Sequence, residues 1–171
     1  MRDVMKKLPD VFESTDLTRV IGIPQIQLNK FIERSQYGVR ASIRTGRGRG
    51  RRRLFSAEDV FGVALAWWLS ESGLRSLMIA RVLDDICKRK GGTANEAAKK
   101  LLDFGAEALL IARKPRTQAY AVKQERRTPQ KVDILREPDV FSMMQRDTGP
   151  ATILLRVGNL FASLKKGMEA L

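Results

Sequence analysis

Residues 16–34 read Asp16-Leu-Thr-Arg-Val-Ile-Gly-Ile-Pro-Gln-Ile-Gln-Leu-Asn-Lys-Phe-Ile-Glu-Arg34 and predict two short helices joined by a sharp turn. Ser14 or Thr15 can cap a first helix that begins at Asp16, whose carboxylate suits the positive end of a helix. Gly22 can take the left-handed conformation that ends a helix and turns the chain. Pro24 is tolerated in the first turn of a second helix. The pattern therefore predicts a helix–turn–helix.

The second helix, expected over residues 24–33, divides into an apolar and a polar face. Ile26 or Ile23, with Leu28, Phe31 and Ile32, would face the core. The polar residues left on the outer face are Gln25, Gln27, Asn29, Lys30 and Arg34. Gln and Asn can pair with adenine edges in the major groove of DNA, and Lys and Arg reach guanine or phosphate. Since any exposed helix carries polar residues, this face alone identifies no ligand.

A dense run of positive charge follows the helix pair. Seven arginines and no acidic residue lie between Gly38 and Phe55, namely Arg40, Arg44, Arg47, Arg49, Arg51, Arg52 and Arg53. Ile43 and Leu54 have strand character and three glycines lie between them, so we expect a β-hairpin over residues 39–55. If all seven arginines neutralised phosphates, the logarithm of the affinity would fall with the logarithm of salt concentration with a slope on the order of −6.

Two kinds of contact are open for the tip of this hairpin. Arg47-Gly48-Arg49 matches the Arg-Gly-Arg element of AT-hook peptides, which lie in the narrow minor groove of A·T-rich DNA. A basic tip that touches phosphates without sequence preference is the alternative. Either way the hairpin is expected to bind a polyanion.

The composition favours a nucleic-acid partner. The chain has 171 residues, a 43% hydrophobic share that suits a packed core, and a net charge of +13. Residues 1–90 carry 18 Lys and Arg against 10 Asp and Glu, a net of +8, whereas residues 91–171 carry 14 against 9, a net of +5. The stronger polyanion signal therefore belongs to the first half.

Several other functional classes are disfavoured by what the sequence lacks. With no histidine and the single cysteine Cys87, the chain can form neither an internal disulfide nor a His/Cys zinc site. The N-terminus lacks a signal-peptide core, and no stretch approaches the roughly 20 apolar residues of a membrane span. No nucleophile-and-base pattern or phosphate-cradling glycine motif is present. We expect a cytoplasmic protein that is not an enzyme, has no cofactor and does not enter a membrane.

The remainder of the first half predicts two more helices. Ser56 can cap a helix with the apolar stripe Phe61, Leu65, Trp68 and Leu69, extended by Trp67 and ending before Gly73. Another helix is expected from about Leu74 to Lys88, with Leu77, Met78, Val82, Leu83 and Ile86 facing inward. Gly91-Gly92 then breaks the chain and is expected to separate a domain at 1–90 from a module at 93–171.

The second half is expected to be a small α+β module. Thr93 caps a helix through Phe104, residues 108–113 and 118–123 form a hairpin, and residues 132–135 form a short strand. A short helix at 140–145, a β segment at 151–157 and a final helix capped by Asn159 complete the series. The expected fold class of the whole chain is α+β.

Residues 14–83 resemble the DNA-binding domain of the MerR family of bacterial transcription regulators. The matching pieces are the turn at Leu17–Gly22-Ile23, the second-helix positions Leu28 and Phe31, the segment Arg53-Leu54-Phe55-Ser56 with Asp59 following, and Gly73-Leu74-Arg75-Ser76-Leu77-Met78-Ile79. Their order and spacing agree with the family pattern. The differences are Asn29-Lys30 where the family has Arg-Tyr, and a longer wing far richer in arginine.

The resemblance implies a winged helix-turn-helix protein of the bacterial nucleoid that binds palindromic double-stranded DNA as a homodimer. Its second helix would enter the major groove, with contacts from Gln25, Gln27, Asn29 and Lys30. Wing contacts would come from Arg40, Arg44 and Arg53. Dimerisation is expected through residues 93–171, and whether that module also binds an effector stays open.

Two other functions remain alternatives. The Gly/Arg-rich segment and the basic second half also suit an architectural nucleoid protein, or a plasmid or phage accessory protein, with little sequence specificity. An RNA-binding module ranks lower, because aromatic residues make up only 6% of the chain and those present fall on apolar faces.

Overall fold

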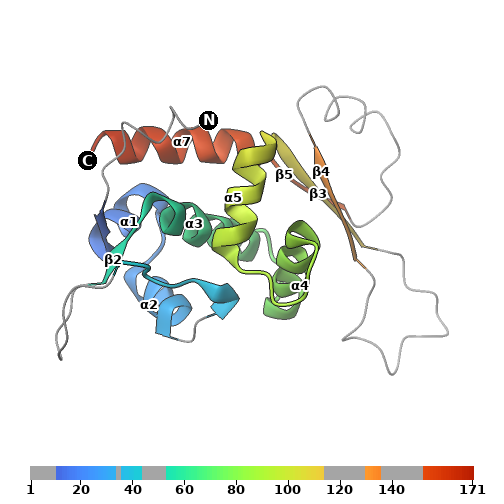
Figure 1. Ribbon diagram of the computed structural model, residues 1–171, viewed down its shortest axis with the longest axis horizontal. Coiled ribbons are helices and arrows are strands. Elements are labelled where there is room, and N and C mark those ends of the chain that lie inside the picture. Colours follow the sequence, from blue (N-terminus) through green and yellow to red (C-terminus); the bar gives the residue numbers. More distant parts are fainter. Residues whose placement is uncertain (1–10, 34–35, 44–52, 114–129, 136–151) are drawn as a thin grey trace.

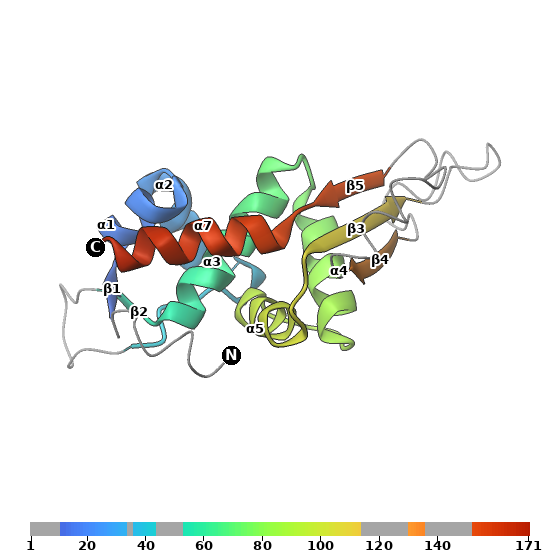
Figure 2. The ribbon, with the colours of Figure 1, turned by 90° about the horizontal axis from the view of Figure 1, so that it is seen from above.

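The computed structural model describes residues 11–33, 36–43, 53–113, 130–135 and 152–171. Helices predominate in these ranges and are joined by two small antiparallel sheets, which agrees with the expected α+β class. The first two helices lie towards one end of the long axis and the three-stranded sheet towards the other (Figure 1), and the view from above agrees (Figure 2). No helix in the described ranges has the length and apolar character needed to cross a bilayer.

Helix α1 (Ser14–Ile21) begins two residues earlier than expected, and its cap is Glu13 rather than Ser14 or Thr15. The Glu13 side chain accepts a hydrogen bond from the backbone of Asp16, while the Asp16 carboxylate accepts one from the Glu13 amide at 2.7 Å. This reciprocal pair satisfies two amides that the first turn of a helix leaves without partners. A Glu can thus serve as the capping residue that the sequence rules assign to Ser or Thr.

Gly22 ends α1 in the predicted left-handed conformation, with φ of +76°, and its amide donates to the Thr18 carbonyl at 3.1 Å. Helix α2 (Gln25–Glu33) follows at once. The carbonyl of Pro24 accepts the amides of Gln27 and Leu28, at 2.9 and 3.0 Å. The helix–turn–helix geometry expected from the glycine and the proline is therefore present.

A short antiparallel pairing joins the chain just before α1 to the chain just after residues 40–53, the arginine-rich segment. Strand β1 (Phe12–Glu13) pairs with β2 (Leu54–Phe55), so that Phe12 lies opposite Phe55. Ile43 forms an isolated antiparallel bridge to Leu54. Residues 44–52 lie outside the described residues, so the hairpin expected over 39–55 stays a prediction beyond this bridge at its base.

Helix α3 (Ala57–Glu71) is the centre of the molecule. Ser56 caps it as predicted, accepting the Asp59 amide at 3.2 Å. Every residue from Asp59 to Ala66 is buried, because other helices surround this segment. Both tryptophans are half-buried against the core: the ring of Trp67 lies 6.3 Å from that of Phe31 in α2, and the ring of Trp68 lies 5.8 Å from that of Phe161. Core packing thus accounts for both.

Helix α4 (Ser76–Cys87) directs a slightly different face inward than expected. Val82, Leu83 and Ile86 are buried as predicted, and Ile79 joins them. Leu77 is 64% exposed, so its predicted inward position is wrong. At about 100° per residue, Leu77 lies some 200° around the helix from Ile79, which places it on the opposite side.

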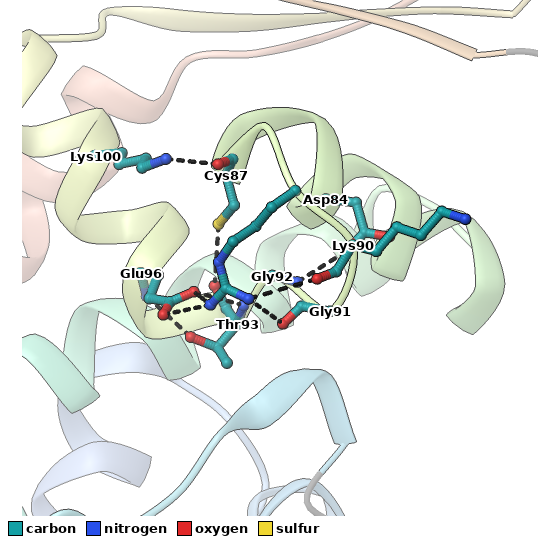
Figure 3. A network of polar contacts seen from close by, with 9 residues as sticks. Asp84, Cys87, Lys90, Gly91, Gly92, Thr93, Glu96 and Lys100 are labelled. Carbon is teal, nitrogen blue, oxygen red and sulfur yellow. Dashed lines mark hydrogen bonds and ion pairs between the residues drawn. The ribbon is translucent and has the colours of Figure 1, made fainter.

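A polar network holds the turn between α4 and α5 (Ala94–Phe104). The Gly92 amide donates to the Asp84 carboxylate at 2.9 Å, and the Lys100 ammonium donates to the Cys87 carbonyl at 2.6 Å (Figure 3). Thr93 caps α5 as predicted, in a reciprocal pair with Glu96, which also binds Arg89. A Cβ on Gly92 would lie 2.8 Å from that of Cys87, so the turn requires a glycine at this position.

The three-stranded sheet has the order β4-β3-β5 and is antiparallel throughout. Strand β3 (Ala108–Arg113) pairs with β4 (Gln130–Leu135) on one edge and with β5 (Thr152–Leu155) on the other. Since both edges of β3 are occupied, its expected hairpin partner at 118–123 is wrong. Residues 118–123 themselves and the helix expected at 140–145 lie outside the described residues.

The final helix, α7 (Val157–Glu169), begins before Asn159, so the predicted cap is wrong and Arg156 occupies that position. The helix packs back across the first half of the chain, beside α1 and α3 (Figures 1 and 2). The ring of Phe161 lies 5.3 Å from that of Phe61, edge to face. A Cβ on Gly167 would lie 3.0 Å from a methyl group of Val20.

One buried cluster runs through all these helices and includes Leu17, Leu65, Leu101 and Met168. Helices from both sides of Gly91-Gly92 contribute to it. The division into domains at 1–90 and 93–171, and a dimer formed through the second of them, stay predictions.

Candidate nucleic-acid interface

The outer face of α2 carries the polar residues that the sequence assigned to it. Leu28 and Phe31 are buried, with exposed fractions of 0% and 5%, and they fix which side of the helix faces the core. Gln25 and Lys30 are exposed, while Gln27 and Asn29 are half-buried at the flanks. The side-chain amide of Gln25 donates to Asn29 Oδ1 at 3.2 Å. This face thus combines amide donors and acceptors with an exposed ammonium group.

The structure decides between the two isoleucines that could have faced inward. Ile23, in the turn, is 1% exposed and belongs to the core, whereas Ile26, in the first turn of α2, is 69% exposed. Ile26 therefore lies on the outer face among the polar residues. The sequence pattern left this choice open, because an isoleucine before or after Pro24 suits the apolar stripe equally well.

Arg53 connects the arginine-rich segment to α2. Its Nη1 lies 3.4 Å from Asn29 Oδ1, and its Nη2 lies 3.6 Å from Glu33 Oε1. Arginine has donors only, so the contact turns the oxygen of the Asn29 amide towards Arg53 and leaves the NH₂ group of that amide facing elsewhere. The side chain of Arg53 is 39% exposed and that of Glu33 is 60% exposed. Such an exposed pair contributes about 0–1 kcal/mol, so a phosphate can readily compete for Arg53.

A buried carboxylate, Asp59, holds the two ends of the arginine-rich segment together. It is 2% exposed. Its Oδ2 accepts the Ser42 amide at 3.0 Å, the Ser56 amide at 2.9 Å and the Ser42 hydroxyl. Its Oδ1 accepts the side-chain amide of Asn95, from α5, at 2.7 Å. Because these bonds satisfy the carboxylate, it can stay buried without a cation beside it.

The remaining arginine positions divide into one that is described and six that are not. Arg40 is exposed, directly after the fully buried Val39. Val39 anchors the chain at this point, so the start of the segment is fixed to the core next to η2 (Gln36–Gly38). The other predicted site residues, Arg34, Arg44, Arg47, Arg49, Arg51 and Arg52, lie outside the described residues.

Elsewhere in the described part of the chain, acidic and thiol groups do not form a second site. No three Cys, Asp or Glu side chains of these ranges converge as metal ligands. Partial desolvation, and then the neighbouring Asp84, raise the pKa of Asp85 near the end of α4. Burial likewise raises the pKa of the Cys87 thiol, which favours its unreactive protonated form. Asp84 and Cys87 belong to the support of the α4–α5 turn, where Asp84 accepts the Gly92 amide and the Cys87 thiol lies against the Thr93 carbonyl.

No protein-family model matches the chain, and no curated protein matches it either. The geometry of α2 and of the described ends of the arginine-rich segment, together with the sequence, therefore carries the inference of function.

Three residues of this region were not predicted in their present roles: Ile26, Ser42 and Asn95. Asp59 was expected only as part of the family resemblance. The Asp59–Asn95 contact joins residues 36 positions apart in different helices, and no local pattern signals it. The capping pattern Ser56-x-x-Asp59 was the one available hint that this carboxylate has a structural role.

Proposed function

We propose that the chain binds double-stranded DNA, with the outer face of α2 in the major groove and residues 40–53 on the flanking backbone or minor groove. The observation that carries this proposal is the contact of Arg53 with Asn29 and Glu33. It puts the end of the arginine-rich segment beside the polar face of α2, so a single duplex can meet both. Had the two lain on opposite sides of the molecule, no single duplex could do so.

The chemistry of the two elements is complementary. On α2, Gln25, Gln27 and Asn29 offer amide groups for base edges, and Lys30 offers a cation for guanine or phosphate. The arginines supply sequence-independent attraction to phosphates, which fixes the register of the protein on the duplex. Together they favour a sequence-preferring binder, and the resemblance to the MerR pattern favours a transcription regulator that acts as a homodimer.

An architectural DNA-binding protein is the second candidate. It is favoured by the charge of the arginine-rich segment, seven arginines without an acidic residue, which by itself gives strong and unspecific affinity. The exposed amide groups on α2 favour the first candidate, because phosphate binding alone does not require them.

Selection of bound duplexes from a random pool by the full chain separates the two candidates. A defined palindrome supports the regulator, and enrichment of A·T-rich DNA alone supports the architectural protein. On an enriched duplex, Asn29→Ala and Gln27→Ala should each alter base preference by about 1–3 kcal/mol for each pair of hydrogen bonds to a base edge that the variant cannot form. Unchanged preference in both variants would contradict the assignment of α2 to the major groove.

A further inference from the structure

Ile26 stands out among the apolar side chains of the described residues. It is 69% exposed, more than Leu77 at 64%, Val11 and Leu171 at 44%, or Phe104 at 43%. Single exposed apolar residues are common on protein surfaces and need no explanation by themselves. The exposure of Ile26 indicates a binding role because this residue lies within the outer face of α2.

Helix geometry puts Ile26 near the middle of the outermost stripe of α2. At about 100° per residue, the buried Leu28 and Phe31 define an inward direction from which Ile26 points almost directly away. Asn29 and Lys30 follow three and four positions later, so both are its neighbours one turn along the same face. Ile26 is thus an apolar member of a surface whose other members are amides, the Lys30 ammonium and, two turns along, the exposed Glu33 carboxylate that pairs with Arg53.

The charges around Ile26 favour DNA over an apolar protein surface as its partner. Lys30 lies one turn away, and Arg53 contacts Asn29 and pairs with Glu33 on the same face, so that two cations face one carboxylate there. A second protein would have to bury these charges to cover the isoleucine, at a cost in desolvation, whereas a duplex meets them with phosphates. Ile26 also lies in the first turn of α2, and the N-terminal residues of a recognition helix are those that contact base edges.

The major groove offers one apolar group at a base edge, the C5 methyl of thymine. We infer that Ile26 is a specificity-determining residue that packs against this methyl group and selects a thymine at one position of each bound site. The inference rests on the proposed binding of DNA by α2. Isoleucine is branched at Cβ and has few rotamers. Its side chain therefore contacts the thymine methyl group only within a narrow range of positions.

Deoxyuridine tests this contact, because it lacks the C5 methyl and keeps every hydrogen-bonding group of thymine. An enriched duplex from the random pool is synthesised with each thymine replaced in turn by deoxyuridine, and equilibrium binding of the full chain is measured. One replacement in each bound site should weaken binding about fourfold, the factor expected when one methyl-sized apolar group is no longer buried. Ile26→Ala should bind the thymine and deoxyuridine duplexes equally.

Leu77→Ala serves as the matched control, since Leu77 is an apolar side chain of similar exposure on α4. This variant should keep the fourfold preference for thymine. Equal binding of every deoxyuridine duplex by the unaltered chain would overturn the contact and leave DNA binding by α2 in place. A thymine preference that persists in Ile26→Ala would also overturn it. Failure to bind any duplex would instead overturn the proposed function, and the contact with it.

Discussion

Arg53 and Asn29 lie in contact, with Nη1 of the guanidinium 3.4 Å from Oδ1 of the amide. They are 24 positions apart in the sequence, and the contact joins the end of the arginine-rich segment to the outer face of α2. The other nitrogen of the same guanidinium, Nη2, lies 3.6 Å from Glu33 Oε1. Arg53 is thereby held where its guanidinium can bind either these two protein acceptors or a phosphate.

Glu33 should weaken DNA binding, because its carboxylate competes with phosphates for Arg53 and repels them. We expect Glu33→Gln to tighten binding about two- to fivefold at low salt, with the gain fading as salt screens the charges. Fluorescence anisotropy with a labelled duplex over a range of salt concentrations measures this. Glu71→Gln, an exposed change at the end of α3, is the control. An equal effect of both changes would mean that net charge alone, and not the position of Glu33, is responsible.

The arginines at the centre of the segment should act without regard to sequence. Replacement of Arg47, Arg49 and Arg51 together by alanine should weaken binding to all duplexes and reduce the steepness of the log–log salt dependence by about 3, since each phosphate that is no longer neutralised lowers it by about 0.9. Binding measured on an enriched and on an unrelated duplex checks both points. A loss confined to the enriched duplex would show that these arginines read bases instead.

Asp59 should be the most sensitive polar residue for stability. Asp59→Ala leaves the Ser42 and Ser56 amides and the Asn95 side chain without their acceptor in a buried region, and we expect a loss of about 3 kcal/mol in the free energy of unfolding. Asn95→Asp, nearly identical in shape, sets two carboxylates against each other and should cost about 2 kcal/mol. Urea unfolding followed by circular dichroism provides the measurement.

The exposed Asp103, at the end of α5, gives the control for these changes: Asp103→Asn should alter the free energy of unfolding by less than about 0.5 kcal/mol. If Asp59→Ala were as mild as this control, the network of Asp59 would not be what fixes the ends of the arginine-rich segment.

The cap of α5 should give stability a specific dependence on pH. A hydrogen bond from Arg89, and then those from Thr93, lower the pKa of Glu96. A carboxyl group whose pKa is lowered on folding stabilises the fold above its unfolded pKa of about 4.3, and this contribution is lost as the pH falls through the folded value. Because the pair is exposed, solvent screening keeps the effect on stability small.

A double-mutant cycle of Glu96→Gln and Arg89→Gln isolates this contribution. The coupling between the two changes should be favourable at pH 7 and fade over the acidic range in which Glu96 of the folded protein becomes protonated. A coupling that remains constant over this range would contradict the assigned role of the carboxylate.

The sequence predicted the elements whose ends are set by local hydrogen bonds. Gly22 ends a helix, and Ser56 and Thr93 each begin one, through hydrogen bonds to residues three or four positions away. The structure confirms all three of these helix ends. The starts of α1 and α7 were misplaced, because Glu13 and Arg156 occupy cap positions that rules based on Ser, Thr and Asn do not assign to them.

Strand pairing and long-range contacts could not be derived in the same way. Residues 108–113 and 132–135 were expected to be strands, but which strands share an edge depends on distant parts of the chain. β3 pairs with segments that begin 17 and 39 residues after its end at Arg113. The contact of Asp59 with Asn95 in α5 and that of Arg53 with Asn29 in α2 also join distant parts of the chain. The polar face of α2 was predictable from its period, and the exposed Ile26 within it was not.

A hydroxyl-radical footprint on an enriched duplex tests the joint action of α2 and the arginine-rich segment most directly. The unaltered chain should protect a central region and the sequence immediately beside it, while the variant lacking Arg47, Arg49 and Arg51 should keep the central protection and lose the flanking one. Asn29→Ala should reduce the central protection. Flanking protection that persists in the triple variant, or a duplex left unprotected by the unaltered chain, would contradict this joint action.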